Sequence, residues 1–150
     1  MRTAFSLSNL LILPLWVLMI LFPHWRWTRR ILQSPFVVVP PAAMYAALVL
    51  PRAGKILPVV TNPKLPEVAA LLGTPDGATI GWAHFLTFDL FVGRWAYLDS
   101  RERNISAWLM APVLFLILML GPVGFLLYLV LRSLTGTRIA DAPVVRGAGA

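Results

Sequence analysis

The chain has no cysteine and few charged residues for its length. Its 150 residues include 6 Asp or Glu, 13 Lys or Arg and no Cys. The absence of cysteine excludes disulfides, thiolate catalysis, iron–sulfur clusters and cysteine-based zinc sites. Charged residues make up 13% of the chain and hydrophobic residues 59%, whereas about a quarter of the residues of a soluble domain are charged. A soluble fold of this size cannot keep so many apolar side chains from water, so the composition indicates an integral membrane protein.

The net charge of +7 is spread along the chain rather than gathered in one segment. A nucleic-acid-binding protein is expected to cluster its basic residues on one face. Here the basic residues flank long uncharged runs, a pattern that is typical of membrane topology and of contact with anionic lipid. The expected partner is therefore membrane lipid and not nucleic acid.

Three long runs contain no Asp, Glu, Lys or Arg, and they cover residues 3–25, 31–51 and 104–131. A helix needs about 20 mainly apolar residues to cross a bilayer core about 30 Å thick. A further apolar and aromatic segment carries His84, Asp89 and Arg94. We therefore expect four transmembrane helices, over residues 5–22, 35–50, 79–98 and 107–131.

The predicted fold class is all-α, a polytopic membrane protein with a bundle of four transmembrane helices within residues 1–132. Pro40 and Pro41 lie near the middle of the second span and remove backbone donors there. This predicts a kink or a partial break in that helix. Residues 133–150 are rich in Gly, Ala and Thr, and we expect them to form a flexible C-terminal tail.

The longest polar connection, residues 52–78, contains the signals of a short helix. Pro66 suits a first helical position, Glu67 suits the first turn, and Gly73 suits the end. An apolar face on this helix places it at the membrane interface. The alternative is a solvated loop with a single helical turn.

An even number of spans places both termini on one side of the membrane, and basic residues gather on the cytoplasmic side. The side of the termini carries seven of them: Arg2, Arg52, Lys55, Lys64, Arg132, Arg138 and Arg146. The other side carries five, or six with Arg94 at the interface: Arg26, Arg29, Arg30, Arg101 and Arg103. This small excess favours cytoplasmic termini.

A signal peptide is the alternative interpretation of the first apolar segment. Residues 5–22 are longer than a usual signal core, and no small-residue cleavage site follows them. Arginines follow the segment at once, beginning with Arg26. These features favour a helix that is retained in the mature protein.

Asp89 is the most informative residue of the third span. If the helix begins near Thr79, Asp89 lies about 15 Å into the membrane, close to its midplane. An unpaired charge at that depth costs about 2.5 kcal/mol or more. Asp89 is therefore either protonated or paired inside the bundle, and a carboxyl at this depth indicates a functional site.

Arg94 and His84 are the other two candidate site residues of this span. Arg94 follows Asp89 by five positions, a rotation of about 140° on a helix, so a direct pair within the helix is not expected. Arg94 either finds a partner on another helix, on free backbone or on a ligand, or it reaches out to lipid headgroups. An ordinary hydrogen-bonded imidazole near the interface explains His84 more simply than a metal or pigment ligand.

Aromatic and glycine residues suggest the walls of a site. Three phenylalanines lie deep in the third span, Phe85, Phe88 and Phe91. Their rings either line a channel for a flat apolar ligand or pack against lipid. In the last span the glycines and proline of residues 121–124 predict a bend and close helix packing. This stretch is the expected second wall of a site around Asp89.

Three strings carry a resemblance to a known family: GATIGW at 77–82, HFLTFDLFVGRWAYLD at 84–99 and LMLGPVG at 118–124. They resemble the abscisic-acid-deficient-four-like family of small membrane proteins. The resemblance covers residues 10–132 and is most specific in residues 77–103. Plant members of that family are plastid proteins required to make neoxanthin from violaxanthin. The resemblance implies a role in carotenoid, or xanthophyll, metabolism.

The reaction that the resemblance implies can be compared with these residues. Turning an epoxy carotenoid end group into an allene removes one polyene proton and opens the epoxide to a tertiary alcohol, without exchange of electrons. The reaction needs a base for the proton and an acid or cation for the epoxide oxygen. Asp89, His84 and Arg94 are groups of these types, with the acid and base roles of Asp89 and His84 left open. The resemblance thus implies a carotenoid isomerase that needs no cofactor and no metal.

A non-catalytic accessory subunit is the alternative. Such a subunit binds pigment or lipid and packs against other subunits of a photosynthetic or biosynthetic membrane complex. In that case His24 or His84 can ligate chlorophyll magnesium, although an interfacial position explains His24 more simply. The chain has no long N-terminal extension of the kind that directs import into plastids. We therefore expect a bacterial inner or photosynthetic membrane.

Overall fold

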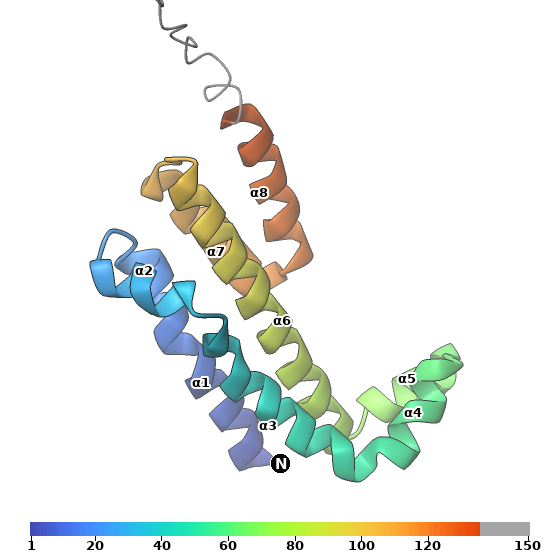
Figure 1. The fold of residues 1–150 in the computed structure, drawn as a ribbon. Helices are drawn as coiled ribbons and strands as arrows, with labels where there is room; N and C mark the ends of the chain where they lie inside the picture. Colours follow the sequence, from blue (N-terminus) through green and yellow to red (C-terminus); the bar gives the residue numbers. More distant parts are fainter. Residues whose placement is uncertain (136–150) are drawn as a thin grey trace, which may run out of the picture.

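A computed structural model describes residues 1–135 of the chain, and these residues are almost entirely helical (Figure 1). The elements are α1 (Arg2–Leu21), α2 (Arg26–Gln33), the 3-10 turn η1 (Pro35–Val38), α3 (Val39–Val49), the 3-10 turn η2 (Leu50–Arg52), α4 (Ala53–Thr61), α5 (Leu65–Leu72), α6 (Pro75–Glu102), α7 (Ala107–Leu120) and α8 (Pro122–Thr135). No strand occurs in residues 1–135, so the predicted all-α class is confirmed. Most of the predicted tail, residues 136–150, lies outside the described residues.

The long helix α6 is the centre of the fold. It contacts α1, α3, α7 and α8 along its length and α2 and α5 near its two ends (Figure 1). The contact with α1 is close because Gly93 of α6 has no side chain. A Cβ at Gly93 would lie 2.3 Å from the ring of Trp16, which is itself 1% exposed. The buried Trp16 ring therefore packs directly on the α6 backbone.

Two helical stretches are long and apolar enough to cross a membrane, Arg2–Leu21 and Pro35–Thr61. They correspond to the first two predicted spans. Helix α6 contains the third predicted span and extends beyond it at both ends. Its 28 residues are about 42 Å long.

The fourth predicted span is wrong as a single helix over residues 107–131. The structure divides it at Gly121 into α7 and α8, each of 14 residues. The two helices run side by side in opposite directions (Figure 1), and Leu109 near the start of α7 lines a cavity with Thr135 at the end of α8. At about 21 Å, each helix is shorter than a bilayer core of about 30 Å. We call α7 and α8 together the α7–α8 hairpin.

Backbone geometry at the tip explains this reversal. Gly121 has a φ of 22°, a conformation that glycine adopts without a Cβ penalty. Pro122 then begins α8, and a proline is well suited to a first helical position. The close packing predicted for Gly124 is confirmed, because a Cβ there would lie 2.2 Å from the backbone nitrogen of Ile117. At the expected bend, the chain therefore reverses its direction completely.

The hairpin changes the positions of the chain ends. The N-terminus and the end of α8 at Thr135 lie at opposite ends of the bundle (Figure 1). The expectation that both termini share one side rested on four complete spans. The described residues do not support this expectation, because the hairpin returns to the end of the bundle from which it started (Figure 1).

Pro40 and Pro41 do not break a helix. They occupy the first turn of α3, where backbone N–H groups have no partner within the helix and proline is tolerated. The irregular turns are η1 before α3 and η2 after it, and each contains a proline. The kink or partial break predicted at Pro40 and Pro41 is therefore wrong, and the irregular turns flank α3 instead.

The short helix predicted between Pro66 and Gly73 is confirmed as α5. Glu67 lies in its first turn and Gly73 follows its last residue. Helix α4, which the sequence did not indicate, packs against α5, and both extend sideways from the end of the bundle that holds the N-terminus (Figure 1).

Candidate functional site

An apolar groove runs between α3 and α6. Two adjoining cavities, of about 290 Å³ and about 270 Å³, form it, and Tyr45 of α3 and His84 of α6 line both of them. Phe88 and Phe91 also line the first cavity. Phe85 lines the second. We call the two cavities together the α3–α6 groove.

The groove is long because it follows the axis of α6. Its lining on α6 extends from Gly77 to Phe91, about 21 Å at 1.5 Å per residue. At the Gly77 end, Val68 and Leu71 of α5 and Val60 of α4 complete the wall. The small helices α4 and α5 therefore extend the groove beyond α3.

His84 lies in the middle of this groove among aromatic rings. Its ring centroid is 5.3 Å from that of Tyr45 and 4.8 Å from that of Phe88. The imidazole has no hydrogen-bond partner among residues 1–135. It is half-buried, so its ring nitrogens are available to a ligand in the groove.

Asp89 lies on a different face of α6 from His84 and meets the tip of the α7–α8 hairpin. A Cβ at Gly121 would lie 2.4 Å from Oδ1 of Asp89. The expectation that residues 121–124 form a wall beside Asp89 is confirmed at Gly121. The half-buried carboxylate has no hydrogen-bond partner among the described residues.

Arg94 joins α6 to the end of α2. Its Nε donates a hydrogen bond to the carbonyl of Leu32 at 2.6 Å, and one terminal nitrogen donates to the carbonyl of Gln33 at 2.9 Å. The last carbonyls of a helix lack partners within it, and a cation there is favoured by the helix dipole. The expectation of a partner outside α6 is confirmed, and the partner is free backbone at the C-terminus of α2.

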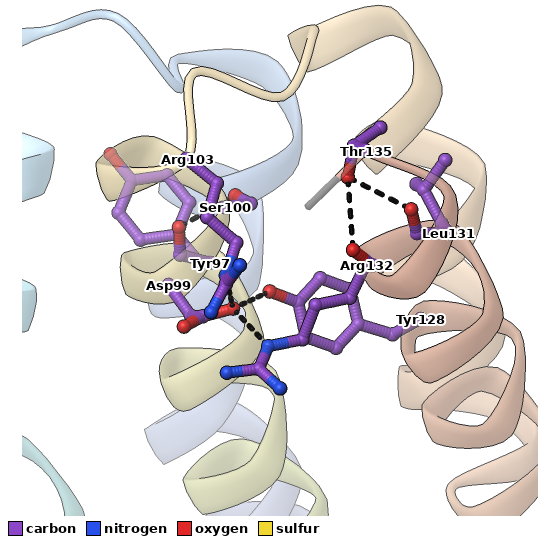
Figure 2. A network of polar contacts seen from close by, with 8 residues as sticks. All are labelled: Tyr97, Asp99, Ser100, Arg103, Tyr128, Leu131, Arg132 and Thr135. Carbon is purple, nitrogen blue, oxygen red and sulfur yellow. Dashed lines mark hydrogen bonds and ion pairs between the residues drawn. The ribbon is translucent and has the colours of Figure 1, made fainter. Parts of the chain in front are cut away.

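A polar cluster at the end of α6 holds α8 in place (Figure 2). The carboxylate of Asp99 accepts hydrogen bonds from Tyr128 Oη, from Arg103 Nε at 2.8 Å and from Arg132 Nε at 2.9 Å. Asp99 and Arg103, four positions apart, form an ion pair. Trp95 packs its ring edge-on against Tyr128, with centroids 5.5 Å apart. Since Tyr128 and Arg132 belong to α8, the cluster fixes the returning arm of the hairpin on α6.

The structure does not bring His84, Asp89 and Arg94 into one site. They face α3, the hairpin tip and α2 respectively. The groove contributes instead Tyr45, which the sequence analysis missed. Its signal was present, because Tyr45 is the one polar aromatic side chain in the uncharged run 31–51.

Metal and pigment ligation depend on where the histidines and carboxylates lie. Among residues 1–135 no group of three or more His, Asp or Glu side chains is placed to hold a metal ion. His24 lies away from the groove, in a cavity lined by arginines at the other end of α1. His84 is thus the histidine whose position suits an apolar ligand.

Comparison with known proteins places this architecture in a family. A family model described as ABA DEFICIENT 4-like matches residues 3–128. The chain belongs to the ABA DEFICIENT 4-like family. No curated protein and no solved structure matches the chain.

The family match covers all the features described above except the end of α8. It includes the α3–α6 groove, the tip of the hairpin at Gly121 and, at its last residue, Tyr128 of the polar cluster. The resemblance inferred from residues 77–103 is therefore confirmed.

Proposed function

We propose that this member of the ABA DEFICIENT 4-like family is a membrane protein of carotenoid metabolism that binds a xanthophyll in the α3–α6 groove. Family membership supports a role in carotenoid- and neoxanthin-related metabolism. The groove is the observation that carries the proposal, because it is long, apolar and lined by aromatic rings. A polyene with a ring at its end has the same shape and polarity.

The proposed reaction is the opening of an epoxide at the carotenoid end group to give an allene. The imidazole of His84 takes one proton from the polyene, the electron pair of that C–H bond forms the new double bond, and a C–O bond of the epoxide breaks. The phenol of Tyr45 gives its proton to the departing oxygen, which becomes a tertiary alcohol. His84 then returns its proton to Tyr45, whose ring lies beside it. The step is an isomerisation, so no redox cofactor enters it.

Asp89 and Arg94 are assigned positioning roles in this proposal. Arg94 donates to the last carbonyls of α2, and Asp89 receives the tip of the hairpin. Both contacts therefore position other helices against α6. Neither residue lines the α3–α6 groove.

The proposed membrane arrangement has three crossings and one hairpin that enters and leaves on the same side. α1, the stretch Pro35–Thr61 and α6 form the crossings, with α5 at the interface. The end of the bundle with α2 then carries six basic residues among the described ones, or seven with Arg94: Arg26, Arg29, Arg30, Arg101, Arg103 and Arg132. The end with the N-terminus carries four: Arg2, Arg52, Lys55 and Lys64. Basic residues favour the cytoplasm, so this arrangement places the N-terminus outside the cytoplasm.

Pigment analysis of variants tests the proposed reaction. The full chain is expressed in bacteria engineered to accumulate an epoxidised xanthophyll, and extracted pigments are separated by chromatography. His84→Gln is expected to reduce conversion by about 10²-fold or more, the usual contribution of a general acid–base group. His24→Gln makes the same chemical change outside the groove and is expected to leave conversion intact.

A second variant separates catalysis from binding. Ala42 lines the groove beside Tyr45, and Ala42→Trp fills it, so co-purification of pigment with the protein should be lost. Loss of conversion in His84→Gln with retained pigment supports the isomerase. Retained pigment and no conversion even by the wild-type chain favours the accessory, pigment-binding role. Unchanged pigment in Ala42→Trp, with normal expression, contradicts the groove as the site.

A further inference from the structure

A further cavity, which shares no lining residue with the α3–α6 groove, lies between α2 and the connection from α6 to α7. Its volume is about 860 Å³. Four arginines line it, Arg26, Arg29 and Arg30 of α2 and Arg101 of α6, together with His24. We call it the arginine cavity.

Within residues 1–135, the positive charge of the arginine cavity is not balanced by carboxylates. No Asp or Glu of these residues lines the cavity. The ion pairs of residues 1–135 involve Asp76, Glu67 and Asp99, and none of them includes an arginine of this cavity. Asp99, at the same end of the bundle, is already held by Arg103, Arg132 and Tyr128 (Figure 2).

Backbone and side-chain donors of the cavity wall are also free. Ser106 precedes α7 and makes no capping hydrogen bond with its side chain. Ala107 and Trp108 begin this 14-residue helix and line the cavity, and their amides have no acceptor among the described residues. The Nε of Arg101 is buried and lacks a hydrogen-bond partner in the same part of the chain, while a terminal nitrogen of Arg101 donates to the carbonyl of Ile105. Free amides at a helix N-terminus, combined with its dipole, favour an anion.

We infer that the arginine cavity binds a phosphate group. Arginine forks and helix N-terminal amides together match the several acceptor oxygens of a phosphate. Two sources carry this chemistry, the headgroup of an anionic phospholipid and a soluble phosphate compound. Trp25 and Trp108 flank the cavity and are 50% and 89% exposed, as expected for rings at a membrane interface. This site is independent of the α3–α6 groove and of the reaction proposed there.

A lipid-binding measurement on the purified full-length protein tests the inference. Affinity is measured by native mass spectrometry or by fluorescence titration in detergent micelles, with phosphatidylglycerol compared to phosphatidylcholine. The cavity variant is Arg26→Gln with Arg29→Gln, two exposed side chains that take part in no ion pair. Each arginine near a membrane surface contributes about fivefold to the binding of an anionic lipid. The double variant is therefore expected to weaken binding of phosphatidylglycerol by about 25-fold.

The matched control removes the same charge at the other end of the bundle. Arg2→Gln with Lys55→Gln is expected to change the affinity for phosphatidylglycerol less than about twofold, because these residues lie far from the cavity. Equal thermal unfolding midpoints of both double variants in phosphatidylcholine micelles establish that each remains folded.

Soluble pyrophosphate, added to protein in phosphatidylcholine micelles, distinguishes the two sources. Binding of pyrophosphate that the cavity variant weakens supports a site that accepts phosphate without acyl chains. Binding of phosphatidylglycerol alone, weakened by the same variant, supports a headgroup site. The inference is overturned if the wild-type chain does not distinguish phosphatidylglycerol from phosphatidylcholine and ignores pyrophosphate. It is also overturned if the cavity and control variants lose affinity equally, since that result reflects net charge only.

Discussion

The carboxylate of Asp89 lies against Gly121, in the space that a side chain at position 121 would occupy. A Cβ at Gly121 would lie 2.4 Å from Oδ1 and 3.3 Å from Cγ of Asp89. Asp89 lies in the middle of α6, about 21 Å from Pro75 at its start. The tip of the α7–α8 hairpin therefore ends halfway along α6.

Gly121→Ala is expected to destabilise the protein by about 1–3 kcal/mol, the cost of an unfavourable backbone conformation, to which the clash with Asp89 adds. An alanine at this position would have an unfavourable φ of 22°, and its Cβ would clash with the Asp89 carboxylate. Thermal unfolding in detergent measures the loss. Gly54→Ala is the control, because a Cβ at Gly54 has nothing within 4 Å and alanine favours the helix by about 0.5–1 kcal/mol. Equal midpoints for the two variants would show that the tip is not packed as described.

Asp89→Asn is expected to leave pigment conversion within about threefold of wild type, because a group outside the groove does not contribute the 10²-fold or more of an acid–base catalyst. Asparagine keeps the shape of the side chain beside Gly121 and cannot ionise in this half-buried position, so stability should be equal or higher. Chromatography of pigments and thermal unfolding of the same preparation check the two statements. A loss of conversion as large as that of His84→Gln, at normal expression, would assign Asp89 a catalytic role instead.

Arg94→Lys is expected to cost about 1 kcal/mol of stability, because an ammonium cannot reproduce the guanidinium's planar fork. The arginine donates to two successive carbonyls at the end of α2, those of Leu32 and Gln33. A lowering of the unfolding midpoint by a few degrees, with conversion per folded protein unchanged, is the expected result. Arg30→Lys is the control, since Arg30 contacts the ring of Trp27 and has no carbonyl partner within residues 1–135. An Arg94→Lys variant as stable as this control would contradict the capping role.

Cysteine labelling tests the hairpin directly, and the lack of native cysteine makes each introduced thiol unique. Glu102→Cys and Ser133→Cys lie at the two ends of the segment that contains the hairpin, and Asn62→Cys lies at the opposite end of the bundle. All three positions are exposed. A membrane-impermeant maleimide applied to intact spheroplasts should give positions 102 and 133 the same result, either both labelled or both unlabelled. Position 62 should give the other result. Labelling of positions 102 and 133 from opposite sides would instead show that the segment between them crosses the membrane once.

Much of the local structure follows from the sequence. Pro66, Glu67 and Gly73 are enough to predict α5, since proline, acid and glycine have fixed preferences at helix ends. The i, i+5 spacing of Asp89 and Arg94 rotates the two side chains apart, so their separate partners were predictable from helix geometry alone. The family resemblance in residues 77–103 likewise depends on the order of the amino acids and on no contact between helices.

The α7–α8 hairpin and the pairing of Tyr45 with His84 depend on tertiary structure. The uncharged run 104–131 has the length and composition of one spanning helix. A glycine and a proline within it can either bend a helix or reverse the chain. The reversal is selected by the packing of Gly121 on Asp89 and by the hydrogen bond that joins Asp99 to α8. Tyr45 and His84 lie 39 positions apart, and only the packing of α3 on α6 brings their rings within 5.3 Å. Helix periodicity determines which side chains share a face, but the contacts between helices determine which faces meet.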